Sequence, residues 1–112
     1  MATTSPTQRS LKLLREQGYT CWIVEVYNRF AKKRLDLFNF ADILAIKPGE
    51  ILAVQTTTAS HLSERIKKIT AEPMAKTWCE AGGLIVCHGW RKYVKPDEHG
   101  NYWRPNTTHI QL

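Results

Sequence analysis

Cysteine is scarce in this chain of 112 residues, and long apolar runs are missing. The three cysteines, Cys21, Cys79 and Cys87, lie far apart, form no Cys-x-x-Cys pair and have no histidine at metal-ligand spacing. We therefore expect reduced core cysteines. No apolar run approaches the roughly 20 residues of a membrane-spanning helix, and the opening MATTSPTQRS lacks the basic and apolar regions of a signal peptide. These absences predict a cytoplasmic protein that does not cross a membrane.

Acidic residues are also few. The chain has 10 of them against 16 lysines and arginines, which gives a net charge of +6 and a pI near 9.4. Cations gathered on one face neutralise phosphates and so supply most nonspecific affinity for nucleic acid. The alternative is a basic, solvated surface without a particular partner. The candidate DNA-binding cations fall into three groups: Lys32, Lys33 and Arg34; Arg65, Lys67 and Lys68; and Arg91 and Lys92.

The remaining composition is that of an ordinary globular domain. Apolar residues make up 43% and charged residues 23%, which excludes a mainly disordered or fibrous chain. A chain of 112 residues is long enough for one core and too short for two. We find no internal repeat, so we predict a single domain over residues 1–112.

The order of the predicted elements indicates an α/β fold. Ser5 and Pro6, with Gln8 three residues after the serine, predict the start of a helix that ends at Gly18. The elements that follow are a strand over 19–30, a basic connection, hairpin strands over 37–46 and 50–58, a helix from 60 that breaks at 73 and stops at 82–83, a strand over 84–94, a turn over 97–101 and an edge strand over 102–112. We therefore predict an α-β-β-β-α-β core, with helices flanking a central mixed sheet.

The hairpin places polar residues at the outer ends of two apolar strands. With the turn centred between Pro48 and Gly49, Asp42 lies across from Gln55, and Phe40 lies across from Thr57. Cross-strand neighbours and alternate residues share a face. The pattern therefore predicts one polar corner made by Asp42, Gln55 and Thr57.

This arrangement resembles the core of the PD-(D/E)XK nuclease superfamily, the restriction-endonuclease-like fold, and is most similar to its small Holliday-junction-resolvase and VRR-NUC branches. The likeness rests on the helix, the strand, a hairpin of the form Asp…(Asp/Glu)-x-Lys, a basic helix and a further strand, and it covers roughly residues 8–92. The resemblance implies a DNA nuclease that hydrolyses phosphodiester bonds with Mg²⁺ or Mn²⁺. Carried over by position, Asp42 is a metal ligand, Gln55 stands at the second acid, Thr57 at the lysine, and Glu16 is the helix glutamate that joins the metal site.

Two of these positions depart from the family pattern. Gln55 is neutral where an acid is expected, although its amide oxygen remains a suitable ligand for Mg²⁺. Thr57 cannot supply the positive charge that the lysine brings to the attacking water. On the helix after the hairpin, Arg65 or Lys68 is a candidate substitute, and the alternative for each is a solvated surface charge.

Several other acidic and aromatic residues could have either a functional or a structural role. Asp36 is either a second acid or a loop residue that caps backbone amides, and Glu25 either faces the site or needs another partner within its strand. Trp22, Trp78 and Trp90 are predicted to be core residues, although Trp90 together with His88 could also stack on nucleic acid.

Three functions remain open from the sequence. The first is a metal-dependent nuclease that acts on branched or single-stranded DNA, for which a twofold dimer would match the two symmetric scissile phosphates of a four-way junction. The second is a catalytically inactive nuclease fold that binds DNA or protein, and the third is a scaffold or inhibitor that uses its sheet edge or aromatic tail. Small stand-alone domains of this kind are similar to proteins of phages and mobile elements.

Overall fold

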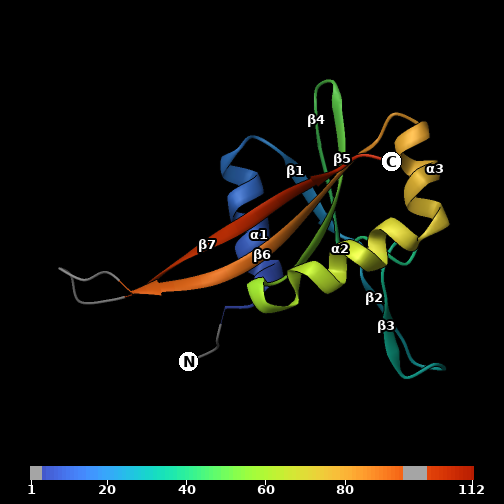
Figure 1. Ribbon diagram of the computed structural model, residues 1–112. Coiled ribbons are helices and arrows are strands. Elements are labelled where there is room, and N and C mark those ends of the chain that lie inside the picture. The colour runs from blue at the N-terminus through green and yellow to red at the C-terminus, as the bar shows by residue number, and fades with distance from the viewer. Residues whose placement is uncertain (1–3, 95–100) are drawn as a thin grey trace.

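The computed structural model describes residues 4–94 and 101–112 and shows an α/β fold (Figure 1). A five-stranded sheet has the order β1-β4-β5-β6-β7. Its strands are β1 (Thr20–Ile23), β4 (Ile43–Lys47), β5 (Glu50–Thr58), β6 (Leu84–Val94) and β7 (Asn101–Ile110). The pair β5 and β6 is parallel and the other neighbours are antiparallel, which confirms the mixed sheet.

Helices cover both faces of this sheet. The helix α1 (Pro6–Glu16) packs on one face, and η1 (Ala59–His61), α2 (Leu62–Ala71) and α3 (Pro73–Glu80) form the crossover on the other. Ser5 caps α1 by accepting a 3.2 Å hydrogen bond from the Gln8 amide, as predicted. Proline at position 73 starts α3 rather than continuing α2, because it has no amide hydrogen to donate. Among the residues that the structure describes, no helix has both the length and the apolar character to cross a membrane.

The predicted hairpin register is confirmed. The Cα partners run from Ile43 with Val54 to Lys47 with Glu50, so Asp42 comes next to Gln55 at the open end. Gly49 has a φ of 82°, the left-handed conformation that a type II turn needs at this position. The Lys47 ammonium lies 3.9 Å from the Glu50 carboxylate across the turn.

The first hairpin strand is shorter than predicted. It begins at Ile43 instead of residue 37, because Phe38 and Asn39 take left-handed φ values of 51° and 68°, which interrupt a strand. The Phe40 side chain turns into the core and packs edge-on against Trp78, with 6.4 Å between the ring centroids. The predicted pairing of Phe40 with Thr57 is therefore wrong.

The strand predicted over 19–30 divides in two. Pairing of β1 with β4 stops near Val24, whose amide donates to the Asp42 carbonyl at 2.9 Å. Beyond that point β2 (Val26–Asn28) leaves the sheet and pairs with β3 (Lys33–Leu35) as a two-stranded ribbon that projects from the body (Figure 1). The predicted turn over 97–101 falls mainly on residues outside the described ranges.

Trp22 is 75% exposed, so its prediction as a core residue is wrong. The neighbouring Cys21 packs on the cluster below α1, and alternation along β1 turns Trp22 to the opposite face. Helices α2 and α3 cover that face over β5 and β6, and β1 lies at the far edge of the sheet. Of the other two predicted core tryptophans, Trp90 is buried as expected, and Trp78 is half-buried and packs against the cluster below α2 and α3.

Two hydrophobic clusters fill the space between sheet and helices. One joins Ala53 and Cys87 to Ile69 of α2 and Ala75 of α3. The other joins residues of β4, β5 and β6 to two leucines of α1: Ile43, Ala45, Leu52, Val54 and Val86 with Leu11 and Leu14. Odd-numbered residues of β5 therefore face α2 and α3, and even-numbered residues face α1. This alternation decides which polar side chains of β5 meet.

Candidate metal centre

Three carboxylates from separate segments converge at the outer end of β4. Glu25 lies between β1 and β2, Asp36 directly follows β3, and Asp42 directly precedes β4. One ligand oxygen from each lies within 4.8 Å of the others. Asp42 is buried, whereas Glu25 and Asp36 are half-buried and connect it to the surface. These three residues are called the acidic cluster below.

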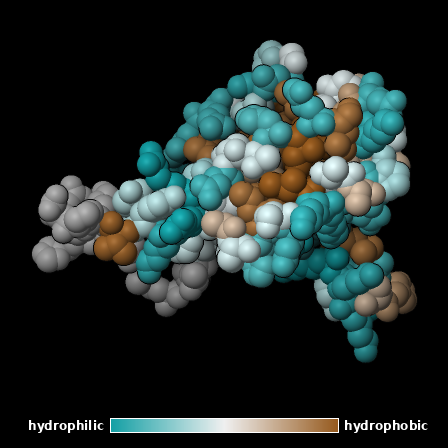
Figure 2. All heavy atoms as spheres, viewed as in Figure 1, coloured by the Kyte–Doolittle hydropathy of each residue, from teal (hydrophilic) through white to brown (hydrophobic). Residues whose placement is uncertain are grey.

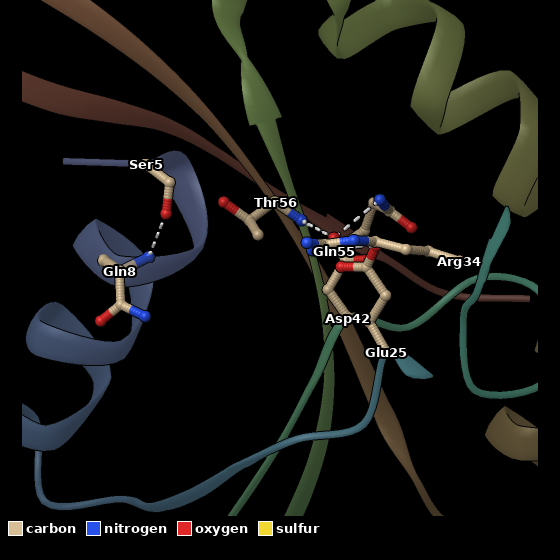
Figure 3. A network of polar contacts seen from close by, with 7 residues as sticks. All are labelled: Ser5, Gln8, Glu25, Arg34, Asp42, Gln55 and Thr56. Atoms are coloured by element: carbon tan, nitrogen blue, oxygen red, sulfur yellow. Dashed lines mark hydrogen bonds and ion pairs between the residues drawn. The ribbon is translucent and has the colours of Figure 1, made fainter. Parts of the chain in front are cut away.

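Gln55 and the β5 backbone hold Asp42 in place (Figure 3). The Gln55 Nε2 and the Thr56 amide each donate a 2.9 Å hydrogen bond to the same oxygen, Oδ2 of Asp42. Asp42 and Gln55 are nearly inaccessible, at 5% and 3% exposure. The predicted corner of aspartate and glutamine is therefore formed, on the face that α2 covers.

The acidic cluster holds more negative charge than its surroundings compensate. Burial raises the pKa of Asp42 to about 8, and the hydrogen bond from the Thr56 amide opposes that shift. The charge of Asp36, a hydrogen bond with Asp36 and the charge of Glu25 raise this pKa further. This raised pKa favours the protonated form of the Asp42 carboxyl at neutral pH. A divalent cation would replace that proton.

A single guanidinium partly offsets the cluster. Arg34 Nη1 lies 3.8 Å from Glu25 Oε1, and Figure 3 shows the two side chains meeting beside Asp42. The Arg34 side chain is 72% exposed, so solvent screens this ion pair strongly. Arg34 therefore offsets only part of the charge of Glu25.

Glu16 is not brought to this cluster. It lies exposed at the end of α1, which packs on the opposite face of the sheet, and it lines a cavity with Trp90 and Trp103. The structure brings Asp36 and Glu25 to Asp42 instead, two acids whose role the sequence left undecided. The signal for Glu25 was a carboxylate within an apolar strand, and the signal for Asp36 was an acid six residues before Asp42.

Thr57 shares the face of Gln55 by alternation and is buried opposite Gly89 of β6. Arg65 of α2 is half-buried, whereas Lys67 and Lys68 are exposed. Burial raises the pKa of the Cys87 thiol to about 11; the charge of Asp42 adds to that shift and the charge of Arg65 opposes it. Cys87 is the register partner of Gln55, so Arg65 acts on the same small region as the acidic cluster.

Two of the three predicted cation groups meet beside the acidic cluster. Lys68 of α2 lines a cavity of about 320 Å³ with Lys33, Arg34 and Asp36. Lys32 lies at the turn of the ribbon, with a φ of 51°. The third group does not join them, because Arg91 and Lys92 line a separate cavity with Trp103 and Ser60.

A second polar cluster lies on the opposite face of β5, and no sequence pattern indicated it. Ser10 Oγ of α1 donates to Thr56 Oγ1 at 2.9 Å, accepts from Trp90 Nε1 at 2.8 Å and lies 2.8 Å from His88 Nδ1. We call these four residues the serine network. Burial, followed by the charge of His109, lowers the pKa of His88 to about 4, so its ring is neutral at pH 7.

Comparisons of the chain with protein families, with curated proteins and with solved structures find no match.

Proposed function

We propose that this protein is a metal-dependent DNA nuclease of the resolvase-like kind, related to the PD-(D/E)XK superfamily that its hairpin resembles. The observation that carries the proposal is the acidic cluster, with Gln55 fixing the orientation of Asp42. Asp42, Asp36 and Glu25 would hold Mg²⁺ or Mn²⁺, with the Gln55 amide oxygen as a further donor. Glu16 drops out of the proposed ligand set because its helix covers the other face.

The donor set fits a hard divalent cation. Mg²⁺ prefers oxygen ligands and usually takes one or two carboxylates together with water and phosphate oxygens. The cluster offers three carboxylates, with one ligand oxygen of each within 4.8 Å of the others, and two of the three are half-buried. Burial raises the pKa of Asp42, and the neighbouring Asp36 and Glu25 raise it further.

Such an ion, when bound, activates a water molecule and neutralises charge that develops on the phosphate. The protein side chains have three tasks beside it. Gln55 keeps Asp42 in one orientation, Arg65 supplies positive charge close to the cluster, and Lys33 and Lys68 hold the DNA backbone in the adjacent basic cavity. In this proposal Arg65 supplies the positive charge that the lysine of the family motif would bring, so Thr57 needs no charged role.

DNA is the substrate that the charge favours. The cavity beside the acidic cluster is lined by three cations from the ribbon and α2, and phosphates are the anions that such a surface neutralises. A cytoplasmic location, a homodimer on a four-way junction and a phage or mobile-element setting belong to the same proposal. Analytical ultracentrifugation with and without junction DNA measures the oligomeric state and so tests the proposed dimer.

The deciding experiment is a cleavage assay on duplex, single-stranded and four-way-junction DNA with Mg²⁺, Mn²⁺ or EDTA. We expect cleavage only with a divalent ion, and none from Asp42→Ala. The matched control is Glu50→Ala, which removes a carboxylate at the other end of the same hairpin, where Glu50 accepts a hydrogen bond from Tyr19. Equal cutting by wild type and Asp42→Ala would remove the assignment.

A second candidate function rests on Gln55 and Thr57, which replace the acid and the lysine of the motif. In that case the chain is an inactive nuclease fold that binds DNA or a protein. It would bind DNA with a steep salt dependence and equal affinity in Mg²⁺ and EDTA, and it would cleave none of the three substrates.

A further inference from the structure

The ribbon of β2 and β3, residues 26–35, exposes apolar side chains that a free surface of this size rarely carries. Phe30 at its turn is 93% exposed, and Val26 and Tyr27 are 64% and 61% exposed. Figure 2 shows brown apolar side chains among hydrophilic ones on this projection. A two-stranded ribbon that does not pack on the rest of a protein is only marginally stable in water. We therefore expect a binding partner to cover its exposed apolar side chains.

The charge of the ribbon selects the partner. Its ten residues include four cations and no acid: Arg29, Lys32, Lys33 and Arg34. All four are exposed. A second copy of the same ribbon would bring like charges together, whereas a polyanion would neutralise them. Exposed aromatic and cationic side chains in one element are the combination that binds bases and phosphates together.

Both ends of the ribbon adjoin members of the acidic cluster. Glu25 directly precedes β2 and Asp36 directly follows β3, and Arg34 of β3 lies 3.8 Å from Glu25. A polynucleotide held by the ribbon would therefore lie beside the cavity lined by Lys33, Asp36 and Lys68. DNA that binds along the ribbon would therefore also have a phosphate close to the carboxylates of the acidic cluster.

We propose that the β2–β3 ribbon enters a groove of the DNA and that Phe30 stacks on a base exposed at a branch point. The major groove of B-DNA is wide enough for a two-stranded ribbon, and apolar wedges inserted at base steps are a known way of holding bent or opened DNA. The inference rests on the proposed nuclease function for its substrate. It adds the element that selects branched over continuous DNA.

The experiment measures binding without cleavage, in EDTA and in the Asp42→Asn background. We expect Phe30→Ala to weaken binding to a four-way junction by about tenfold and binding to continuous duplex by less than about twofold, because the lost contact is stacking on an exposed base. Phe30→Trp should restore junction affinity. The fluorescence of a 2-aminopurine placed at the branch should be quenched by the wild type and by Phe30→Trp, and should not be quenched by Phe30→Ala.

The role of the ribbon cations is tested by removing two of them, with substitutions of one lysine and one apolar residue elsewhere as controls. Lys32→Ala with Lys33→Ala should weaken binding to every DNA and lower the slope of log affinity against log salt by about 2. The controls are Lys76→Ala on α3 and Val94→Ala at the end of β6, both exposed and remote from the ribbon, and neither should change affinity. Far-UV circular dichroism confirms that each variant is folded.

Each outcome decides between the two proposals. Unchanged junction binding by Phe30→Ala and by the double lysine variant overturns the ribbon, and cleavage by the wild type would still support the nuclease. Ribbon-dependent junction binding without cleavage in any metal leaves the ribbon standing and rejects the nuclease. A wild-type dimer that Phe30→Ala converts to a monomer, with unchanged DNA affinity, shows that a second copy covers the ribbon and overturns the inference.

Discussion

The serine network and the acidic cluster lie on opposite faces of β5 and differ by one residue in register. The side chain of Gln55 faces α2 and reaches the cluster, whereas the side chain of Thr56 faces α1 and reaches Ser10. The Thr56 amide also donates to Asp42, so a single residue joins the two. Both sites are polar and contain buried side chains, but they differ in charge and in how their groups are satisfied.

The serine network closes on itself. Its four members are neutral and satisfy one another, and together they attach α1 to β5 and β6. The acidic cluster instead contains three carboxylates, one amide and one exposed guanidinium. A closed network stabilises the fold, while an excess of like charge costs stability and persists where a ligand compensates it. This contrast separates a structural polar site from a candidate functional one.

The largest expected effect is a loss of DNA cleavage on substitution of a residue in the acidic cluster, on the face of β5 that α2 covers. Asp36→Asn should lower metal-dependent kcat/KM by about 10²- to 10³-fold, because it removes a charged ligand oxygen and keeps the side-chain size. The measurement is single-turnover cleavage of junction DNA across a Mn²⁺ titration.

Glu16→Gln is the matched control for that substitution. Its exposed carboxylate lies on the α1 face, so activity should stay within about twofold of the wild type. The reverse result, with Glu16 essential and Asp36 dispensable, would return the helix glutamate to the metal site and contradict the geometry.

The next effect concerns stability. Ser10→Ala should lower the free energy of unfolding by about 3 kcal/mol, because the buried groups of Trp90, His88 and Thr56 lose their shared partner. Urea unfolding followed by tryptophan fluorescence measures it. Any shift of melting temperature on adding Mn²⁺ should be unchanged in this variant, since the proposed cation site lies on the other face of the sheet. A loss below about 0.5 kcal/mol would show that the network contributes little.

The two sites also differ in what the sequence could reveal. Residues 42 and 55 meet through a hairpin whose turn fixes the register, so local pattern was sufficient to pair Asp42 with Gln55. Glu25 and Asp36 join them only because β2 leaves the sheet, and nothing in an apolar strand pattern marks that departure. Ser10 and His88 are 78 residues apart and meet through helix packing, which is set by the tertiary fold.

The mixed sheet and its helices were predictable because each element carries its own signal. Ser5 and Pro6 mark the start of α1, and Pro73 marks the start of α3. The exposure of Trp22 was not predictable in the same way, since it follows from the edge position of β1 and the limited reach of α2 and α3. Periodicity shows which residues share a face and leaves open what covers it.

A third effect is a difference in the pH dependence of stability. The pKa of His88 is lowered from 6.5 to about 4 in the folded protein, so its contribution is full above pH 6.5 and is lost as pH falls toward 4. The pKa of Asp42 is raised from 3.8 to about 8, so its contribution is full at low pH and is lost as pH rises through 8. Between pH 4 and 6.5 the two oppose each other.

Variants separate these opposing slopes. In the Asp42→Asn background, the free energy of unfolding should fall by about 2 kcal/mol between pH 8 and pH 5, because only the His88 slope remains. Adding His88→Gln should abolish that fall. Urea unfolding at both pH values measures it, and a fall that persists in the double variant would show that His88 does not cause the slope.

The smallest expected effect is a gain in stability, whereas most substitutions of buried polar residues lower the free energy of unfolding. Asp42→Asn should raise the free energy of unfolding at pH 8, without divalent ions, by about 1 kcal/mol. The asparagine oxygen can still accept from Gln55 and from the Thr56 amide, while repulsion with Asp36 and Glu25 disappears. The rise in melting temperature that we expect Mn²⁺ to give the wild type should be absent from this variant, because a stabilising ligand needs affinity for the folded state. An asparagine variant that is less stable, with its Mn²⁺ response intact, would place Asp42 among the structural polar groups beside Ser10 and remove the distinction between the two faces.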